Sequence, residues 1–457
     1  MDALVTTRAP LIPPAPRVHP KPLSDLRVMW EMGQNLVGAW AASDFEALLT
    51  PFNFLGKPGL VVSDPAGVRH VLGSHAQRYR RPSKAARPIR PLAGDGLLLA
   101  EGETWRRQRK SLAPVFTPAA IGALLPHFAA AGAALSDQLE GRTRVNLAET
   151  FHQATLDAVL RALFSRRPED GGANLARLAR DYLEGPGHLN LFDFLASGAD
   201  DLTFADGPRR RQGARWFAAV EAIIAERRAA PTGSGDLLDR LLAARDEDGR
   251  PLDDREIRDQ CGTMLVAGFE TTSRLLFWAT YLLALDQTAQ ARVRAEIAAF
   301  PPQQIQTLDD LKAWPLLRSV LMEALRLYPP APLIAREAIE ADEILGHRVE
   351  PGANIVISPW LIHRHKRLWE QPEAFLPDRF IDQPHPWGIE AFIPFGAGPR
   401  VCIGASFAMS EAQLLLASLL SRFQVETISA RPVMPKASVT LGPDHEPDFA
   451  LTAVRQE

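Results

Sequence analysis

The chain contains very few cysteines, only Cys261 and Cys402 among its 457 residues. Two cysteines cannot form a disulfide framework, and they cannot form a structural zinc site built from CxxC pairs. Charge of one sign is also lacking, because 51 Lys and Arg residues face 54 Asp and Glu residues. The overall charge therefore gives no reason to expect nucleic acid or an anionic membrane as a partner.

A long hydrophobic run is absent as well. The longest apolar stretch, residues 275–285, is interrupted by Thr280 and is far shorter than the ~20 residues of a spanning helix. The first 25 residues lack the apolar core and cleavage site of a secretory signal. We therefore expect a cytoplasmic protein with no membrane anchor. Six prolines before residue 23 predict an extended N-terminal lead-in over residues 1–24.

The remaining sequence has the composition of an ordinary globular protein, with 46% hydrophobic and 23% charged residues. Apolar residues at i, i+3 and i+4 spacing predict many helices. The predicted helices span residues 26–40, 117–140, 147–164, 174–183, 209–228, 252–285, 314–327 and 403–423. Short strand-like segments occur at residues 59–63, 347–358 and 436–454. With no obvious linker, the pattern predicts a mainly α fold in which residues 25–457 form a single domain.

The most informative segment is FIPFGAGPRVCIG, residues 392–404. Here Cys402 precedes an amphipathic helix, where backbone N–H groups and the helix dipole are expected to lower the thiol pKa. Gly396, Gly398 and Gly404 permit positive φ and the close approach of a flat ligand. Arg400 can hold an anionic group. A thiolate beneath a planar dianionic ligand suggests haem with an axial cysteine, and an inert buried cysteine is the alternative.

The spacing Phe395-x-x-Gly398-x-Arg400-x-Cys402-x-Gly404 resembles the haem-binding signature of the cytochrome P450 family. The resemblance implies the cytochrome P450 fold, a triangular helical prism with a small β region. It also implies haem b (iron protoporphyrin IX) as the cofactor, with Cys402 as the axial ligand of its iron.

A second motif, residues 267–272 (AGFETT), lies inside the predicted helix 252–285. Its Gly and Thr residues are poor helix formers, and a Thr hydroxyl can bend a helix by bonding to a preceding carbonyl. A buried helix with incidental small residues is the alternative. The motif is similar to the oxygen-activation motif of the family, which implies that Ala267 and Gly268 lie over the haem, with room for dioxygen beside Gly268. Thr271 and Glu270 would then deliver protons as general acid–base groups.

Glu323 and Arg326 stand at i, i+3 on one face of a predicted helix, where they can pair. Taken alone, the pair is typical of an exposed salt bridge, which contributes little stability. In the family, such a pair forms a buried network with the arginine of a segment like Pro377-Asp378-Arg379-Phe380. The resemblance implies that Glu323, Arg326 and Arg379 form this network and lock the cysteine loop.

Several cationic residues are implied to hold the haem propionates. Trp105 and Arg109 share a helix face, and by resemblance both reach the propionates, to which a guanidinium is well suited. Arg336 matches another propionate arginine. Arg106 and Lys110 lie on a different face, which is either simply solvated or a docking patch for an acidic electron donor.

The implied activity is that of a monooxygenase, an oxidoreductase that inserts one atom of O2 into a C–H or C=C bond of a lipophilic substrate. The chain has no flavin or nicotinamide fingerprint, so NAD(P)H electrons are expected through a separate ferredoxin and ferredoxin reductase. We expect a monomer. The expected apolar pocket walls are Leu97, Leu98, Val266 and Leu333.

Three other functions fit the same fold. A peroxide-driven peroxygenase or an isomerase or dehydratase is disfavoured, because the chain keeps Glu270 and Thr271. A non-catalytic haem sensor would bind gases without substrate turnover, and the sequence offers no output domain for it.

Overall fold

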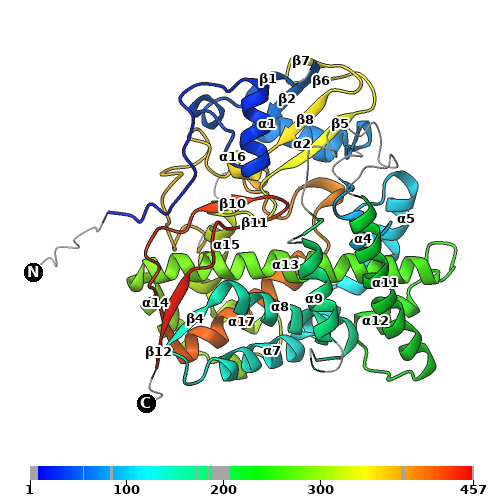
Figure 1. The fold of residues 1–457 in the computed structure, drawn as a ribbon, viewed down its shortest axis with the longest axis vertical. Helices are drawn as coiled ribbons and strands as arrows, with labels where there is room; N and C mark the ends of the chain where they lie inside the picture. The colour runs from blue at the N-terminus through cyan, green and yellow to red at the C-terminus, as the bar shows by residue number, and fades with distance from the viewer. Residues whose placement is uncertain are drawn as a thin grey trace, which may run out of the picture.

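A long helix, α13 (Asp254–Leu285), crosses the middle of the molecule in the computed structural model (Figure 1). A capping box fixes its start. The Asp253 carboxylate accepts the N–H of Glu256 at 2.7 Å, and the Glu256 carboxylate accepts the N–H of Asp253 at 3.1 Å. Most of α13 is buried, so the other helices pack around it. The predicted long helix is confirmed.

The structure describes residues 9–54, 56–82, 86–167, 169, 172–183, 185–187, 206–381 and 388–454. Helices dominate these residues, as predicted. The α-helices other than α13 are α1 (Asp25–Gln34), α2 (Pro65–Arg69), α4 (Arg90–Ala93), α5 (Gly102–Leu112), α6 (Pro118–Gly122), α7 (Leu125–Gln138), α8 (Leu147–Phe164), α9 (Gly172–Leu183), α11 (Asp206–Ala229), α12 (Leu237–Ala243), α14 (Gln287–Ala299), α15 (Pro315–Leu327), α16 (Pro359–Ile362) and α17 (Ala405–Arg422).

The strands form four small sheets. Their bounds are β1 (Leu49–Phe54), β2 (Lys57–Val62), β3 (Tyr79–Arg80), β4 (Arg144–Asn146), β5 (Ile334–Ala338), β6 (Asp342–Ile344), β7 (His347–Val349), β8 (Asn354–Ile357), β9 (Phe423–Thr427), β10 (Pro435–Ala437), β11 (Leu441–Pro443) and β12 (Asp448–Ala453). The largest sheet has the order β1-β2-β8-β5-β3 and lies at the opposite end of the molecule from α7 (Figure 1). A three-stranded sheet has the order β4-β12-β9, and β6–β7 and β10–β11 are two-stranded.

Two predicted helices are shorter in the structure than the apolar pattern suggests, one because it is divided and one because it ends early. The predicted helix 117–140 is divided into α6 and α7, because Pro126 cannot donate a backbone hydrogen bond to Gly122 four residues before it. The predicted helix 26–40 ends at Gln34. There Asn35 turns to the C-terminal β10–β11 hairpin, where its amide donates to Pro435 O at 2.9 Å.

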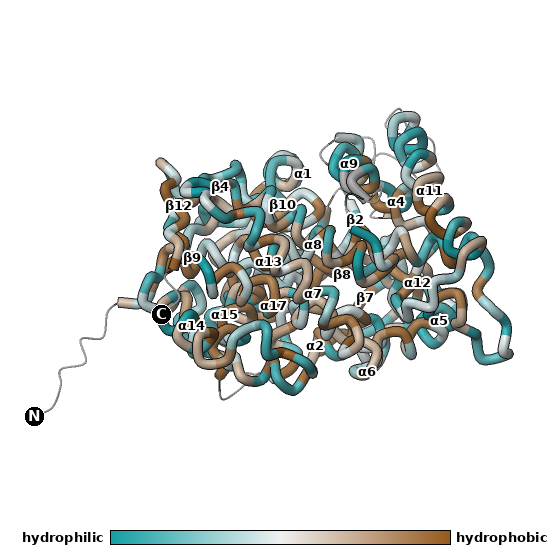
Figure 2. Tube along the Cα trace, turned by 90° about the horizontal axis from the view of Figure 1, so that it is seen from below, coloured by the Kyte–Doolittle hydropathy of each residue, from teal (hydrophilic) through white to brown (hydrophobic). Residues whose placement is uncertain are grey.

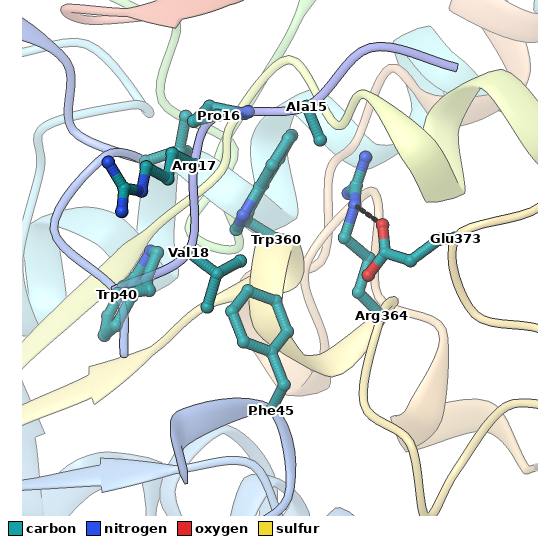
Figure 3. A pocket seen from close by; sticks show the side chains of 10 residues that line it. Ala15, Pro16, Arg17, Val18, Trp40, Phe45, Trp360, Arg364 and Glu373 are labelled. Carbon is teal, nitrogen blue, oxygen red and sulfur yellow. Dashed lines mark ion pairs between the residues drawn. The ribbon is translucent and has the colours of Figure 1, made fainter. Parts of the chain in front are cut away.

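Residues 9–24 of the N-terminal segment form no helix, whereas residues 1–8 of the predicted lead-in lie outside the described residues. The segment packs on the body: Phe375 donates to Leu11 O at 2.8 Å, and Tyr328 donates to Pro14 O at 2.8 Å. Figure 3 shows a small cavity beneath it, where Val18 faces Phe45. The boundary at residue 24 stays a prediction, since the segment is joined to the domain by these contacts.

Within the part of the chain that the structure describes, one helical stretch, Pro118–Gln138, is long and apolar enough by composition to cross a membrane. Half of its apolar window is buried inside the molecule, where α7 packs on α17. Figure 2 shows α7, α17 and α13 gathered in the middle of the molecule. The core packing of α7 is sufficient to explain its apolar composition.

Candidate active site

The loop before α17 is closed by a hydrogen bond that spans the cysteine motif. The N–H of Cys402 donates to the carbonyl of Phe395 at 2.9 Å. Between them, Gly398 adopts φ 68°, and a Cβ on this residue would clash with the carbonyl oxygen of Leu72. Only glycine meets both requirements, so the sequence of the loop holds the sulfur in one place.

The Cys402 side chain is accessible but enclosed by protein. Its residue is exposed, yet burial is the largest influence on the thiol and raises its pKa. The Gly404 N–H and the charge of Arg109 act in the opposite direction but are weaker. The predicted net lowering of the thiol pKa is therefore not found for the protein alone, because desolvation outweighs the Gly404 N–H and the charge of Arg109. Gly404 also adopts φ −89°, so its backbone does not require glycine.

Positive charge gathers near this loop, and Glu101 is the carboxylate that opposes it among the described residues. Burial, followed by the charge of Arg400, lowers the pKa of Arg336 to about 10, and Glu101 is the carboxylate that opposes this shift. Burial and the charges of Arg336 and Arg400 likewise lower the pKa of Arg81 to about 10. The Arg81 Nη1 atom is buried without a hydrogen-bond partner among the described residues. An anionic group is needed here, and haem propionates fit that need.

Arg81 was not identified from the sequence, although it directly follows β3, which pairs with the strand that carries Arg336. Arg400 is already partly satisfied, because it donates to Ala100 O at 3.0 Å and pairs with Glu101 at 2.7 Å. Trp105 lies under its guanidinium, 4.4 Å from ring centroid to Cζ. Trp105 therefore positions Arg400, and direct contact of Trp105 with a propionate stays a prediction.

One face of α13 remains accessible although the helix is otherwise largely buried. Four of its partly accessible residues are spaced i, i+3, i+4 and i+7, namely Met264, Ala267, Gly268 and Thr271. The Thr271 hydroxyl donates to Ala267 O at 2.7 Å, as the motif predicts. An accessible stripe of mostly small residues inside the molecule can face a flat ligand, so this face also fits haem.

The missing side chain of Gly268 also affects helix packing. A Cβ on Gly268 would lie 3.1 Å from Cγ2 of Val159 on α8, so a side chain there would press on this neighbour. The glycine therefore helps α8 to pack closely on α13. Gly268 is itself partly accessible, as Ala267 and Thr271 are, and room for dioxygen beside it stays a prediction.

Glu270 lies next to Thr271 but faces a different set of groups. It is 7% exposed and pairs with Arg274 at 3.0 Å, while the Thr440 hydroxyl donates to it at 2.8 Å. Burial alone would raise the pKa of Glu270, but Arg274, His152 and the Thr440 bond together hold it below its ordinary value. No motif pointed to His152 or Thr440, which lie 118 and 170 residues away from Glu270 along the chain.

The buried ion network is present. Arg326 donates to both oxygens of Glu323, at 2.6 and 2.7 Å, and Arg379 donates to Glu323 at 3.0 Å. The Glu323 and Arg326 side chains have no exposed surface, so the interpretation as an exposed pair is wrong. Arg326 also donates to His363 O at 2.9 Å, and the His363 ring accepts the N–H of Ile393 at 3.0 Å. The network thus connects α15 to the start of the cysteine loop.

The expected pocket walls are only partly supported. Leu97, Leu98 and Leu333 are half-buried, as residues that line an interior space would be. Val266 is 8% exposed and belongs to the main hydrophobic core. Met264, which the sequence analysis did not single out, takes a place on the accessible face of α13 instead.

A second acid lies behind α13. Glu411 of α17 is fully buried, and neither of its carboxyl oxygens has a hydrogen-bond partner among the described residues. Thr272 is near enough to influence it but does not reach hydrogen-bond geometry. Burial, the larger effect, raises the pKa of Glu411 well above its ordinary value of 4.5. Burial therefore favours the neutral form of this side chain.

This acid makes the stability of the protein depend on pH. A raised pKa in the folded state means that stability is full below pH 4.5 and falls as pH rises toward the folded-state pKa. We expect Glu411→Gln to lack this loss, so that it gains about 1–3 kcal/mol on the wild type between pH 5 and pH 8. Urea unfolding at both values measures the gain. Glu426→Gln, at an exposed position of β9, is the control; equal pH dependence of wild type and Glu411→Gln would contradict the prediction.

Comparisons with known proteins agree with this geometry. The family model described as Cytochrome P450 matches residues 49–445. The protein named cytochrome P450 132 of Mycobacterium bovis is 30% identical, over 97% of this chain and 98% of the relative. Cyclooctatin synthase of Streptomyces melanosporofaciens is 30% identical over 85% of each chain, and cytokinin hydroxylase of Arabidopsis thaliana is 31% identical over 80% of this chain and 74% of its own.

A solved structure is similar over nearly the whole chain. The crystal structure of the cytochrome P450DA heme domain has a TM-score of 0.80 and 26% identity, and it covers 98% of this chain and 99% of its own. The expected fold is thereby confirmed. With the cysteine loop, the arginine cluster and the open face of α13, these similarities show that the chain belongs to the cytochrome P450 family, as a haem-thiolate monooxygenase.

Proposed function

We propose that this enzyme inserts one atom of O2 into a C–H or C=C bond of a lipophilic substrate, with electrons from NAD(P)H delivered by a separate ferredoxin and ferredoxin reductase. The observation that carries the proposal is the pair Glu270–Thr271 in α13, of which Thr271 lies on the accessible face. Cys402 lies three residues before the start of α17, which packs on α13. When bound, the haem supplies the activation of O2 and the transfer of an oxygen atom.

The residues of the chain supply anchoring, protons and protection from water. Cys402 would bind the haem iron, while Arg81, Arg109 and Arg336 would hold the propionates. The Thr271 hydroxyl is held toward the accessible face by its bond to Ala267 O, where it can pass a proton to a reacting group. Glu270 is shielded from solvent, so its protons must arrive through neighbouring groups.

The substrate class is proposed from the pocket walls. Leu97, Leu98, Leu333 and Met264 are apolar, which favours lipophilic substrates but discriminates weakly among them. The relative named cytokinin hydroxylase supports hydroxylation as the outcome. A compound library screened for the low-spin to high-spin change of the haem identifies the substrate class; binding by charged compounds alone would contradict it.

The electron donor and the cellular location are also part of the proposal. Both cysteines are unpaired, which is consistent with the reducing cytoplasm. Arg106 pairs with Glu103, and Lys110 pairs with Glu247 at 2.5 Å. These two cations are therefore exposed but neutralised, and they do not support a cationic docking patch on their own. We propose a monomer that meets its donor transiently.

Thr271→Ala tests the proton-delivery role. Without the hydroxyl, protons reach the reacting oxygen less reliably, so we expect the yield of product per NAD(P)H to fall about tenfold or more and hydrogen peroxide to rise. Product, NAD(P)H and peroxide are measured together in the reconstituted system. Thr271→Ser keeps the hydroxyl and serves as the control. Unchanged yield in Thr271→Ala would remove Thr271 from the reaction.

A peroxygenase is the second candidate. Turnover with hydrogen peroxide, and none with ferredoxin, reductase and NAD(P)H, would favour it over the proposed monooxygenase. The retained Glu270–Thr271 pair is the observation against this alternative.

A further inference from the structure

The two carboxylate oxygens of Glu270 have different partners. Oε1 accepts from Arg274 Nε at 3.1 Å and from the Thr440 hydroxyl at 2.8 Å, and Arg274 Nη2 lies 3.0 Å from it. Oε2 faces His152, whose Nδ1 atom lies 3.5 Å away. Because Oε1 is occupied by these donors, Oε2 is the oxygen that can accept a proton. Histidine is the titratable side chain that faces it.

His152 is placed to connect this oxygen with water. It comes from α8, which packs along α13, and its ring lies edge-on to Phe269 with centroids 4.8 Å apart. Its side chain is 13% exposed. The Nε2 atom is buried and has no hydrogen-bond partner among the described residues. A buried ring nitrogen of this kind needs a water molecule, which would continue the path beyond the ring.

We propose that His152 is a positioning residue of the proton supply, which passes protons from water to Oε2 of Glu270. The inference rests on the proposed function, because it adds a source of protons to the Glu270–Thr271 pair. In the step, a hydronium ion gives a proton to Nε2 while the Nδ1 proton moves to Oε2. An O–H bond of the hydronium ion and the Nδ1–H bond break, and the Nε2–H and Oε2–H bonds form. The products are water, a neutral acid and a neutral ring in its other tautomer. Exchange with water restores the starting tautomer.

The groups around the His152 ring favour passing a proton on over holding it. Burial is the largest influence on His152 and lowers its pKa. The nearby cations Arg274 and Arg180 (of α9) lower this pKa further. The carboxylates of Glu270 and, more weakly, Glu149 (of α8) raise it. The net pKa lies below the ordinary value, so the ring is neutral near pH 7 and gives up an added proton readily. Proton delivery should therefore slow as pH rises, because fewer hydronium ions are available to give a proton to Nε2.

His152→Gln tests the relay in the haem-loaded enzyme. Glutamine keeps an N–H donor near Oε2 but cannot pass a proton through. We expect the yield of product per NAD(P)H to fall about tenfold and to lose its decline with pH, while the reduced carbon monoxide spectrum stays unchanged. His127→Gln, at another half-buried histidine, is the control and should behave as wild type.

Glu270→Gln separates the relay from the proposed function. Unchanged yield in Glu270→Gln would overturn the proton role of Glu270 itself. A low yield in Glu270→Gln with a normal yield in His152→Gln would overturn only the relay. We expect the double variant to be no worse than Glu270→Gln, because both residues lie on one path; additive losses would contradict this.

A second measurement does not depend on turnover or on the folding of His152→Gln. Nitrogen-15 NMR of the histidine rings in the diamagnetic carbon monoxide form follows the titration of His152. Since Glu270 raises the pKa of this ring, we expect that pKa to fall in Glu270→Gln. An unchanged pKa would show that the two side chains do not interact, which overturns the proposal.

Discussion

Glu323→Gln is expected to lower the free energy of unfolding by about 3–5 kcal/mol, because it leaves buried arginine charge without its counter-charge. The Glu323 carboxylate is bonded by Arg326 at 2.6 and 2.7 Å and by Arg379 at 3.0 Å. A loss of this size is a large part of the roughly 5–15 kcal/mol that stabilises most proteins. We therefore expect a low yield of folded protein, measured by expression and urea unfolding.

The same change should reduce haem content in the protein that does fold. Arg326 holds the carbonyl of His363, whose ring accepts the N–H of Ile393 just before the cysteine loop. Burial lowers the pKa of His363 to about 3, so the ring is neutral and can act as this acceptor. The ratio of haem absorbance to protein measures the effect.

Asp378→Asn is the matched control for Glu323→Gln. Asp378 pairs with Arg292 at 2.5 Å, but both side chains are about half exposed. Exposed pairs contribute about 0–1 kcal/mol, so we expect a small loss and normal haem content. Equal losses in the two variants would contradict the structural role of the buried network.

Cys402→Ser is expected to abolish monooxygenase turnover. Serine removes the thiolate that would bind the iron, while the loop bond from residue 402 N–H to Phe395 O can remain. We expect the arginine cluster still to bind some haem, but with a changed carbon monoxide spectrum and no product above background. Spectra and product formation are measured on the same preparation.

Cys261→Ala is the control for Cys402→Ser. Cys261 is fully buried in the core at the start of α13, and burial strongly raises the pKa of its thiol. We expect the alanine variant to lose some stability through the small cavity but to keep both spectrum and turnover. Loss of the thiolate spectrum in Cys261→Ala, with its retention in Cys402→Ser, would show that Cys261 is the iron ligand and would contradict the role of Cys402.

Local signals in the sequence were sufficient to predict several helices. The predicted helix 147–164 coincides with α8, because Asn146 caps its start and Ser165 ends it in the left-handed region at φ 54°. Where a residue outside the apolar pattern decides the boundary, as Pro126 does between α6 and α7, the prediction was too long. The periodicity of the apolar residues alone does not show where a proline divides a helix.

The chemistry of the site was less predictable because its contacts are distant in the sequence. The motif identified Glu270, but His152 and Thr440 meet it only through helix and hairpin packing. The dipole argument for Cys402 omitted desolvation, which depends on the whole fold. The motif singled out Gly268, but its contact with Val159 of α8 could not be read from the sequence.

Ligation of haem iron by the Cys402 thiolate is tested most directly by the absorption spectrum of the purified wild-type protein, reduced and exposed to carbon monoxide. Thiolate ligation predicts a Soret band at the long wavelength characteristic of cytochromes P450. A band at the shorter wavelength typical of histidine-ligated haem, in fully folded protein, would contradict that ligation.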